Sequence, residues 1–344
     1  MGSALLNGWR AALLGSVLFL AAGCKEDSPD PGDGQDLDPE STDVCRKPAF
    51  PPDAPWNKDI SSAPLDAQSG AVISSLQAQG WGNGRFQIDF SFEVLCTSDA
   101  PLRTFQKTDD FYAGECDDTA VPVPVGGALE GEAGYQCTGD GDCHLIVIHK
   151  PTRKLYEQWR VDISGNTYRG GCLAVWDLSR VYPPQGRGEQ CTSADAAGLP
   201  ITPLLFDADE VAAGEIKHAI RFILPNSRIR NATYVRPATH ATRAASGGTN
   251  APPYGVRLRL RSNFPVEGLP SAGARVVARA LQKYGMILAD GGNIALTAQS
   301  DRSTAAKWAG LLGPLDLRTI QPSDFEMVEA GSRFTWMGDC VRSP

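Results

Sequence analysis

VRLRLR, at residues 256–261, is the clearest structural signal in this chain of 344 residues. Valine or leucine alternates strictly with arginine, so an extended segment would have one apolar and one charged face. That pattern is typical of a half-buried strand in an antiparallel sheet. Segments 86–94 and 155–161 alternate in the same way, whereas 144–148 and 218–224 are more uniformly apolar, as inner strands are. The middle of the chain is therefore predicted to consist mostly of strands.

Helices are expected to be few. Ser271 can cap a helix that runs to Tyr284 and stops at Gly285, because the apolar residues between them follow helical spacing. Shorter helices are predicted at 303–312 and, for one turn, at 209–213. The chain also has 36 glycines and 25 prolines to form turns. We therefore expect a mainly β fold, a two-sheet antiparallel β-sandwich of jelly-roll type with one or two short helices.

The N-terminus carries the pattern of a secretory signal peptide. Arg10 precedes an apolar run at 11–20, and small residues then lead to Cys24. The run is about half of the ~20 residues that a membrane-spanning helix needs. Residues 1–23 are therefore predicted to be a lipoprotein signal peptide, and the thiol of Cys24 to carry a diacylglycerol that anchors the protein in a membrane. An ordinary signal peptide with an incidental cysteine and a short membrane anchor are the alternatives.

Negative charge is concentrated just after this segment. Residues 25–44 contribute −7 of the net charge of −8, through eight acidic residues and Lys25. We predict that 24–44 is a lipidated, disordered acidic tether and that 45–344 is one disulfide-stapled β-rich domain. The domain is close to neutral and has arginine-rich patches, but no basic face large enough to predict a nucleic-acid partner. Lys25 is not the aspartate associated with inner-membrane retention, which favours the outer membrane.

The cysteine count fits export. Of nine cysteines, eight remain once Cys24 is lipidated, and an even set in an exported chain predicts up to four disulfides. The sequence cannot choose among about 105 pairings. Pairing of nearest neighbours would give Cys96–Cys116, Cys137–Cys143 and Cys172–Cys191, and would leave Cys45 with Cys340. No CxxC pair, phosphate-binding loop, HExxH or EF-hand loop occurs, so neither a metal nor a cofactor is expected.

Several strings in the chain resemble one family of exported bacterial proteins, most of which are known as hypothetical proteins. The strings are TSADAAGLPI at 192–201, DEVAAGEIKHAIRF at 209–222, YVRPATH at 234–240, GVRLRL at 255–260 and ALQKYGMILAD at 280–290, preceded by WNKDI at 56–60, HLIVI at 144–148 and LYE at 155–157. The resemblance covers most of residues 50–330. Because the family is common in saprophytic bacteria with large secretomes, it implies work on polysaccharide. The family commonly has Asp-Asn-Gly where this chain has DGG at 290–292, so any role of that asparagine is absent here.

Five residues are candidates for acid–base chemistry. His144, His218 and His240 belong to the family strings, and they either bond backbone carbonyls or converge on one concave face. Glu157 lies on an apolar strand face, where burial would raise its pKa as a general acid requires, unless an arginine pairs with it. Asp290 follows an apolar strand and is either a second carboxylate at a cleft edge or the first residue of a turn.

Four further residues are candidates for substrate binding. Arg257 and Arg259 project from one strand face and could grip uronate carboxylates, although a solvated outer face has the same pattern. Trp159 could stack on a sugar ring or pack in the core, and Tyr284 is a further binding candidate. The hypothesis is a hydrolase or lyase of extracellular polysaccharide. The alternatives are a non-catalytic glycan- or surface-binding lipoprotein and a structural envelope protein.

Overall fold

The computed structural model describes residues 44–47 and 49–343, which belong to one compact unit. The predicted signal peptide, Cys24 and the predicted tether up to residue 43 lie outside the described residues. No helix in the described part of the chain combines the length and apolarity that crossing a membrane would need.

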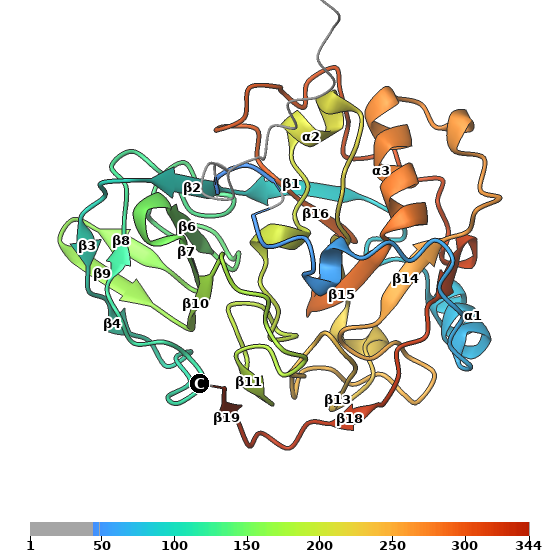
Figure 1. Cartoon of the computed structure of the whole chain (residues 1–344), viewed down its shortest axis with the longest axis horizontal. Coiled ribbons are helices and arrows are strands. Elements are labelled where there is room, and N and C mark those ends of the chain that lie inside the picture. Colours follow the sequence, from blue (N-terminus) through green and yellow to red (C-terminus); the bar gives the residue numbers. More distant parts are fainter. Residues whose placement is uncertain (1–43, 48, 344) are drawn as a thin grey trace, which may run out of the picture. The chain divides into compact units, whose positions relative to one another are not determined.

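The largest sheet has six strands and mixed pairing (Figure 1). In spatial order the strands are β1 (Ile88–Phe92), β16 (Leu296–Gln299), β12 (Ile220–Leu224), β15 (Met286–Gly291), β14 (Arg257–Leu260) and β17 (Phe325–Met327). β14 is the strand that VRLRLR predicts. β1 runs parallel to β16 and β12 parallel to β15, whereas β14 is antiparallel to both of its neighbours.

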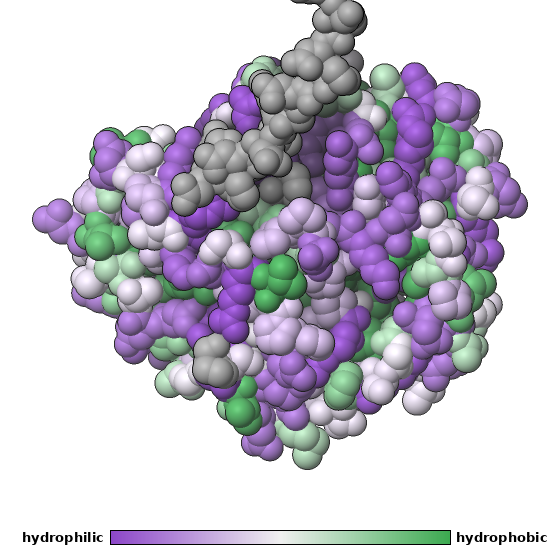
Figure 2. Space-filling view, viewed as in Figure 1, coloured by the Kyte–Doolittle hydropathy of each residue, from purple (hydrophilic) through white to green (hydrophobic). Residues whose placement is uncertain are grey.

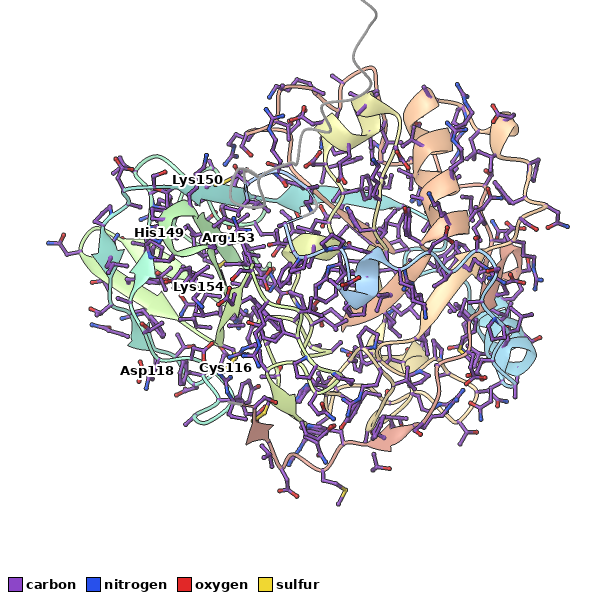
Figure 3. All side chains as sticks on the ribbon, in the orientation of Figure 1. Cys116, Asp118, His149, Lys150, Arg153 and Lys154 are labelled. Carbon is purple, nitrogen blue, oxygen red and sulfur yellow. A yellow bond between two sulfur atoms is a disulfide. The ribbon has the colours of Figure 1, made fainter. Side chains whose placement is uncertain are left out.

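A second sheet has four strands. In order they are β10 (Leu173–Asp177), β7 (Lys154–Gln158), β6 (Leu145–His149) and β2 (Val94–Thr97). Only Glu93 separates β1 from β2, and Figure 1 shows these two strands running on from one sheet into the other. The β6–β7 turn contains η2 (Lys150–Thr152), where Figure 3 shows His149, Lys150 and Arg153 grouped together.

Short ladders and single 3-10 turns complete the fold. Three two-stranded ladders pair β3 (Leu102–Arg103) with β5 (Val121–Pro122), β11 (Gly188–Glu189) with β19 (Val341–Arg342), and β13 (Thr233–Tyr234) with β18 (Phe334–Thr335). A three-stranded sheet has β9 (Thr167–Gly170) between β4 (Gln106–Lys107) and β8 (Asp162–Ser164). The 3-10 turns besides η2 are η1 (Pro55–Asn57), η3 (Thr202–Leu204), η4 (Asn226–Arg228), η5 (Val266–Gly268) and η6 (Pro322–Asp324).

The described residues contain three α-helices: α1 (Ser69–Gln79), α2 (Ala208–Ala213) and α3 (Ala272–Lys283). The Ser271 hydroxyl accepts the N–H of Ala274 at 3.1 Å, which confirms the predicted cap of α3. The helix predicted at 303–312 is wrong, since that segment forms turns. α1 escaped prediction because its start has no side-chain cap and its 11 residues include few large apolar side chains, namely Val72, Ile73 and Leu76.

Both faces of the four-stranded sheet are buried. On β6, Ile146 and Ile148 pack into the main core, while Leu145 and Val147 pack into a smaller core on the opposite face. This explains why the strand is apolar throughout rather than alternating. The mainly β, sandwich-like class is thus confirmed, with mixed rather than purely antiparallel sheets. The face in Figure 2 is mostly hydrophilic, with scattered hydrophobic side chains.

The structure pairs all eight predicted disulfide cysteines. The bridges are Cys45–Cys96, Cys116–Cys172, Cys137–Cys143 and Cys191–Cys340. Only Cys137–Cys143 agrees with nearest-neighbour pairing; the other three pairs were wrong because sheet register brings together cysteines 51, 56 and 149 residues apart. Four disulfides indicate an oxidising compartment.

Candidate functional site

A cleft of about 600 Å³ contains several of the polar groups that lie at strand ends. We call it the Asp290 cleft. Its lining includes four carboxyl groups, one imidazole and four aromatic rings, namely Glu115, Asp142, Asp195, Asp290, His240, Tyr112, Trp159, Tyr254 and Trp336. Asp290 belongs to β15 of the six-stranded sheet, Trp159 directly follows β7 of the four-stranded sheet, and Trp336 follows β18, while most of the others lie in loops. The cleft therefore depends on the tertiary fold and on no single motif.

A β-bulge in β15 places Asp290. Arg221 of β12 pairs with Ile287, but Ile223 pairs with Asp290, so β15 contains one extra residue between them. The extra residue puts Asp290 on the same face of the sheet as Arg221. The carbonyl left out at the bulge, that of Ala289, accepts the N–H of Ala197 at 2.8 Å. The bulge thus joins β15 to the loop that carries Asp195.

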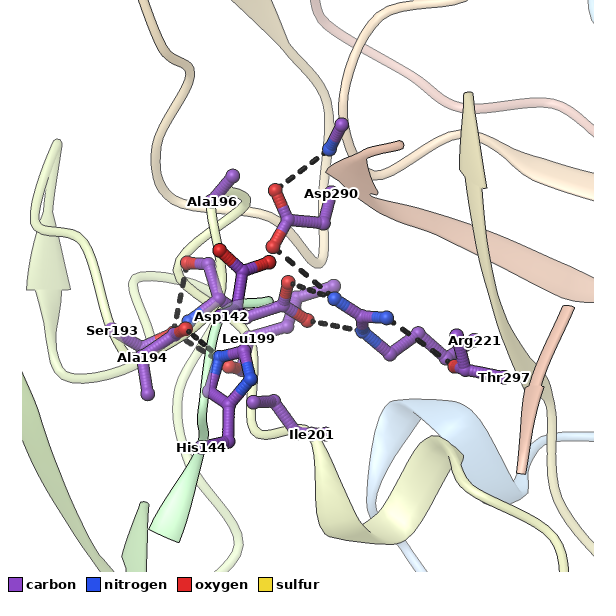
Figure 4. Close-up of polar contacts among 12 residues, drawn as sticks. Asp142, His144, Ser193, Ala194, Ala196, Leu199, Ile201, Arg221, Asp290 and Thr297 are labelled. Atoms are coloured by element: carbon purple, nitrogen blue, oxygen red, sulfur yellow. Dashed lines mark hydrogen bonds and ion pairs between the residues drawn. The ribbon is translucent and has the colours of Figure 1, made fainter. Parts of the chain in front are cut away.

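Arg221 holds two carboxyl groups together (Figure 4). Its Nε and Nη2 donate to the two oxygens of Asp195 at 3.0 and 2.9 Å, and Nη2 also contacts Asp290 Oδ2 at 3.2 Å. The remaining Nη1 reaches Thr297 Oγ1 at 3.3 Å. The Asp195 side chain is fully buried, whereas that of Asp290 is 20 % exposed. Of the pair, Asp290 is the one that a ligand can reach.

The surroundings favour the protonated form of Asp290. Burial raises the pKa of this carboxyl well above its usual value, and the negative charge of Asp195 raises it further, while Arg221 acts in the opposite direction. The Gly291 N–H donates to Asp290 Oδ1 at 2.7 Å and fixes its orientation. Asp290 is therefore a cleft-lining carboxyl group whose environment favours its protonated form.

Asp142 supplies a carboxylate of a different kind. It is exposed, it accepts the indole N–H of Trp159 at 2.9 Å, and its charge contributes to the raised pKa of Asp290. Asp142 and Asp290 both line the cleft, and Figure 4 draws both carboxyl groups on the Asp195 side of the Arg221 guanidinium. The site thus combines a shielded carboxyl group whose surroundings favour protonation with an exposed carboxyl group, and acid–base catalysis uses pairs of carboxyl groups in such contrasting environments.

Two predicted histidines hold the loop beside Asp195. His144 bonds the Ala194 carbonyl at 3.0 Å through Nε2, and His240 donates to the Ala196 carbonyl at 2.7 Å through Nδ1. His240 lines the cleft and packs edge-on against Trp336, with ring centroids 4.9 Å apart. Because burial lowers the pKa of His240 to about 4, its imidazole is neutral near pH 7.

His144 has the opposite charge state. Its Nδ1 lies 2.6 Å from Glu130 Oε2. Burial alone would lower its pKa, but the charge and hydrogen bond of Glu130, with a contribution from Asp142, raise it to about 9. His218 is equally buried, against the Ala219 carbonyl at 2.8 Å and Glu210 at 3.3 Å. Neither His144 nor His218 lines the cleft.

Glu157 is buried away from the cleft. Its carboxylate accepts the N–H groups of Ile201 and Thr202 at 3.0 and 2.8 Å, the Thr202 hydroxyl at 2.8 Å and the Trp176 indole N–H at 3.1 Å. Its partners are therefore backbone and neutral side-chain donors instead of the arginine considered from the sequence. Burial raises its pKa, but no ligand path reaches this fully buried group. We assign it to anchoring the 201–202 loop.

The predicted arginine pair also lies outside the cleft. Arg257 donates to the carbonyls of Tyr284, Pro55 and Lys58 and lines a second, mainly apolar hollow. Arg259 pairs with Glu326 and with carbonyls near Ile60. Tyr284 ends α3 and is 7 % exposed. Of the candidates for catalysis and binding, the cleft brings together Asp290, His240 and Trp159.

Three site residues escaped sequence reasoning: Asp142, Asp195 and Arg221. Arg221 did carry a usable signal, because a charged residue within the apolar strand pattern 218–224 requires a buried counter-charge. Asp195 lies in the TSADAAGLPI string but had no feature that singled it out. Asp142 is in a polar turn whose proximity to β15 depends on the fold.

The comparisons with known proteins add no name to this geometry. No family model matches the chain, and no match is found among the curated proteins or among the solved structures.

Proposed function

We propose that this protein is an exported glycoside hydrolase that cleaves polysaccharide in the Asp290 cleft. The observation that carries the proposal is the pairing of Asp290, whose environment retains its proton, with the solvated carboxylate of Asp142 in one aromatic-walled cleft. Most glycoside hydrolases use two carboxyl groups in these two states. Trp159 and Trp336 line the cleft, and a sugar ring would stack on the face of each indole that Arg160 or Arg243 does not cover.

In the proposed reaction, Asp290 gives its proton to the glycosidic oxygen as the bond from that oxygen to the anomeric carbon breaks. Asp142 either removes a proton from the water that attacks the anomeric carbon or attacks that carbon itself before water replaces it. The anomeric configuration of the first product distinguishes the two routes. Asp195 and Arg221 do not react, since they set the pKa and position of Asp290.

A lyase is the second candidate, because His240 is neutral and lines the cleft. Its pKa of about 4 makes His240 a weak base for removing the proton on the carbon next to a uronate carboxylate. This weak basicity favours the hydrolase over the lyase. A non-catalytic glycan-binding protein would need the aromatic walls but no proton donor. These alternatives predict different products from the same samples.

The test uses the full chain, exported with its disulfides formed and released in detergent. It is incubated with neutral and uronate polysaccharides while reducing ends and the absorbance of unsaturated uronates are measured. We expect reducing ends without new absorbance, and a loss of 10²–10⁴-fold in kcat/KM for Asp290→Asn. Asp99→Asn, on the exposed surface, is the matched control. Unsaturated products would indicate a lyase, and binding without products would indicate a binding protein.

Lipid anchoring is part of the same proposal. The run from Arg10 to Cys24 supports a lipidated N-terminus, preferably in the outer membrane, and the disulfides fit that oxidising location. Metabolic labelling with palmitate should mark the wild-type chain and leave Cys24→Ser unlabelled. Labelling of that variant would exclude Cys24 as the anchor.

A further inference from the structure

We propose that the Asp290 cleft takes a neutral glycan and rejects uronate sugars at the bond that is cleaved. This inference rests on the proposed hydrolase function and names its substrate class. It opposes the expectation, drawn from the arginine row of the sequence, that the protein grips uronate carboxylates. Two observations support it: the charges of the groups that line the cleft, and the hydrogen bonds that already occupy the nearby arginines.

The arginine nearest the proposed acid cannot bind a substrate carboxylate. Arg221 is 3 % exposed, and its Nε, Nη1 and Nη2 atoms donate to Asp195, Thr297 and Asp290. A bidentate arginine–carboxylate pair uses the geometry that would otherwise recognise a uronate. Outside the cleft, Arg257 donates to backbone carbonyls and Arg259 donates to Glu326.

The uncompensated charge in the cleft is negative. Asp195 is neutralised by Arg221 and Asp290 retains its proton, which leaves the carboxylates of Asp142 and Glu115. Arg243 also lines the cleft and keeps its positive charge over the Trp336 ring, 5.8 Å from the centroid, so it offsets one of these two negative charges. The negative charge beside the proposed acid is that of Asp142. A uronate placed beside Asp142 would bring two like charges together, and such juxtaposition rejects a ligand.

The aromatic residues that line the cleft can bind a sugar that carries no charge. Trp159 is fixed by its indole hydrogen bond to Asp142, so its ring is oriented beside the proposed base. Tyr112 is 49 % exposed and Trp336 stands against His240 at another part of the lining. Ring faces of this kind bind the C–H faces of pyranoses by removing apolar surface from water.

The experiment compares substrates that differ only in the carboxylate. Three polyuronates of different linkage are each assayed beside their carboxyl-reduced counterpart, together with neutral α- and β-glucans, using the full chain. Binding of oligosaccharides from the same set to Asp290→Asn is measured by tryptophan fluorescence, with Asp99→Asn as the matched control for cleavage. We expect cleavage of neutral polymers only, and at least tenfold tighter binding of the reduced member of a pair.

The outcomes separate this inference from the proposed function. Hydrolysis of a polyuronate at least as fast as its reduced counterpart overturns the substrate class and leaves the hydrolase standing. Binding of neutral glycans without cleavage overturns the proposed hydrolase function but supports the preference of the cleft for neutral glycans over uronates. Absence of both binding and cleavage across the set overturns both.

Discussion

At the scale of single residues, Asp290 behaves as it does because of its neighbours. Asp195 is fully buried, and its negative charge raises the pKa of Asp290. The positive charge of Arg221, which contacts both carboxyl groups, reduces the repulsion between them. A proton donor requires its protonated form, so activity should fall as the pH rises through the pKa of Asp290. The position of that alkaline limb therefore reports on Asp195.

Asp195→Asn should move the alkaline limb of the kcat/KM profile to lower pH. Removing the negative charge lowers the pKa of Asp290, because its ionised form is no longer repelled. The pH–rate profile of the variant is compared with that of wild type, and with Asp99→Asn as control. An unchanged limb would mean that Asp195 does not set the state of the donor.

His144 should make stability depend on pH in the opposite direction to a carboxylate. Its pKa is raised from 6.5 to about 9 in the folded protein, so its contribution is fully present below about pH 6.5 and is lost as the pH rises through 9. At about 1.4 kcal/mol per pKa unit, roughly 3 kcal/mol is involved. His144→Gln should therefore lower the free energy of unfolding at pH 6 by far more than at pH 9.5. An equal loss at both values would contradict a charged His144.

At the scale of elements, Glu157 illustrates how a catalytic pattern can be structural. The strand β7 places its carboxylate under the 201–202 loop, where four donors use it. Alternation along the strand correctly indicated an inward carboxyl group. It could not show whether the inward face meets a cleft or a loop, because that depends on segments far away in the sequence.

Glu157→Gln should destabilise the protein by about 1–3 kcal/mol. The four groups around the Glu157 carboxylate are all hydrogen-bond donors, so the NH₂ group of glutamine would face donors and find no acceptor. The folded variant should keep its kcat/KM, because Glu157 lies outside the cleft. Chemical denaturation measures the first effect and the hydrolase assay the second. Glu267→Gln, with a side chain 83 % exposed, is the control and should change neither.

At the scale of the whole molecule, the disulfides divide into local and long-range ties. Cys137–Cys143 closes a short loop, whereas Cys191–Cys340 joins residues 149 apart and secures the segment that brings Trp336 to the cleft. On loop-closure entropy, the long tie contributes about 5 kcal/mol and the short one about 2 kcal/mol. The two bridges should therefore differ in their effect on both stability and binding.

Replacing Cys191 and Cys340 by serine should lower the unfolding temperature more than replacing Cys137 and Cys143. It should also raise KM, because Trp336 loses its tie, while kcat changes less. Thermal unfolding and steady-state kinetics of the two double variants provide the comparison. Equal KM values would show that β18 and β19 alone hold the segment.

The sequence predicted strands and helices that have a periodic pattern of apolar residues. It missed the contacts between residues that are far apart in the chain. Alternation identified β14 and helical spacing identified α3, because both patterns reflect local burial. The cleft brings Asp142, Asp195 and Asp290 together across two sheets, and only the bulge in β15 puts Asp290 beside Arg221. No local pattern encodes such proximity, and the same holds for three of the four disulfide pairs.

The strand pair β1 and β2 has a mechanical consequence. Asp142 precedes β6 in the four-stranded sheet and Asp290 belongs to β15 in the six-stranded sheet, while β1 and β2 join the two sheets through the single buried residue Glu93. Because this connection is one buried residue long, and β1 and β2 are each paired within their own sheet, it restricts how far the two sheets can move apart. We therefore expect the separation between Asp290 and Asp142, the proposed proton donor and base, to be nearly the same before and after a ligand binds.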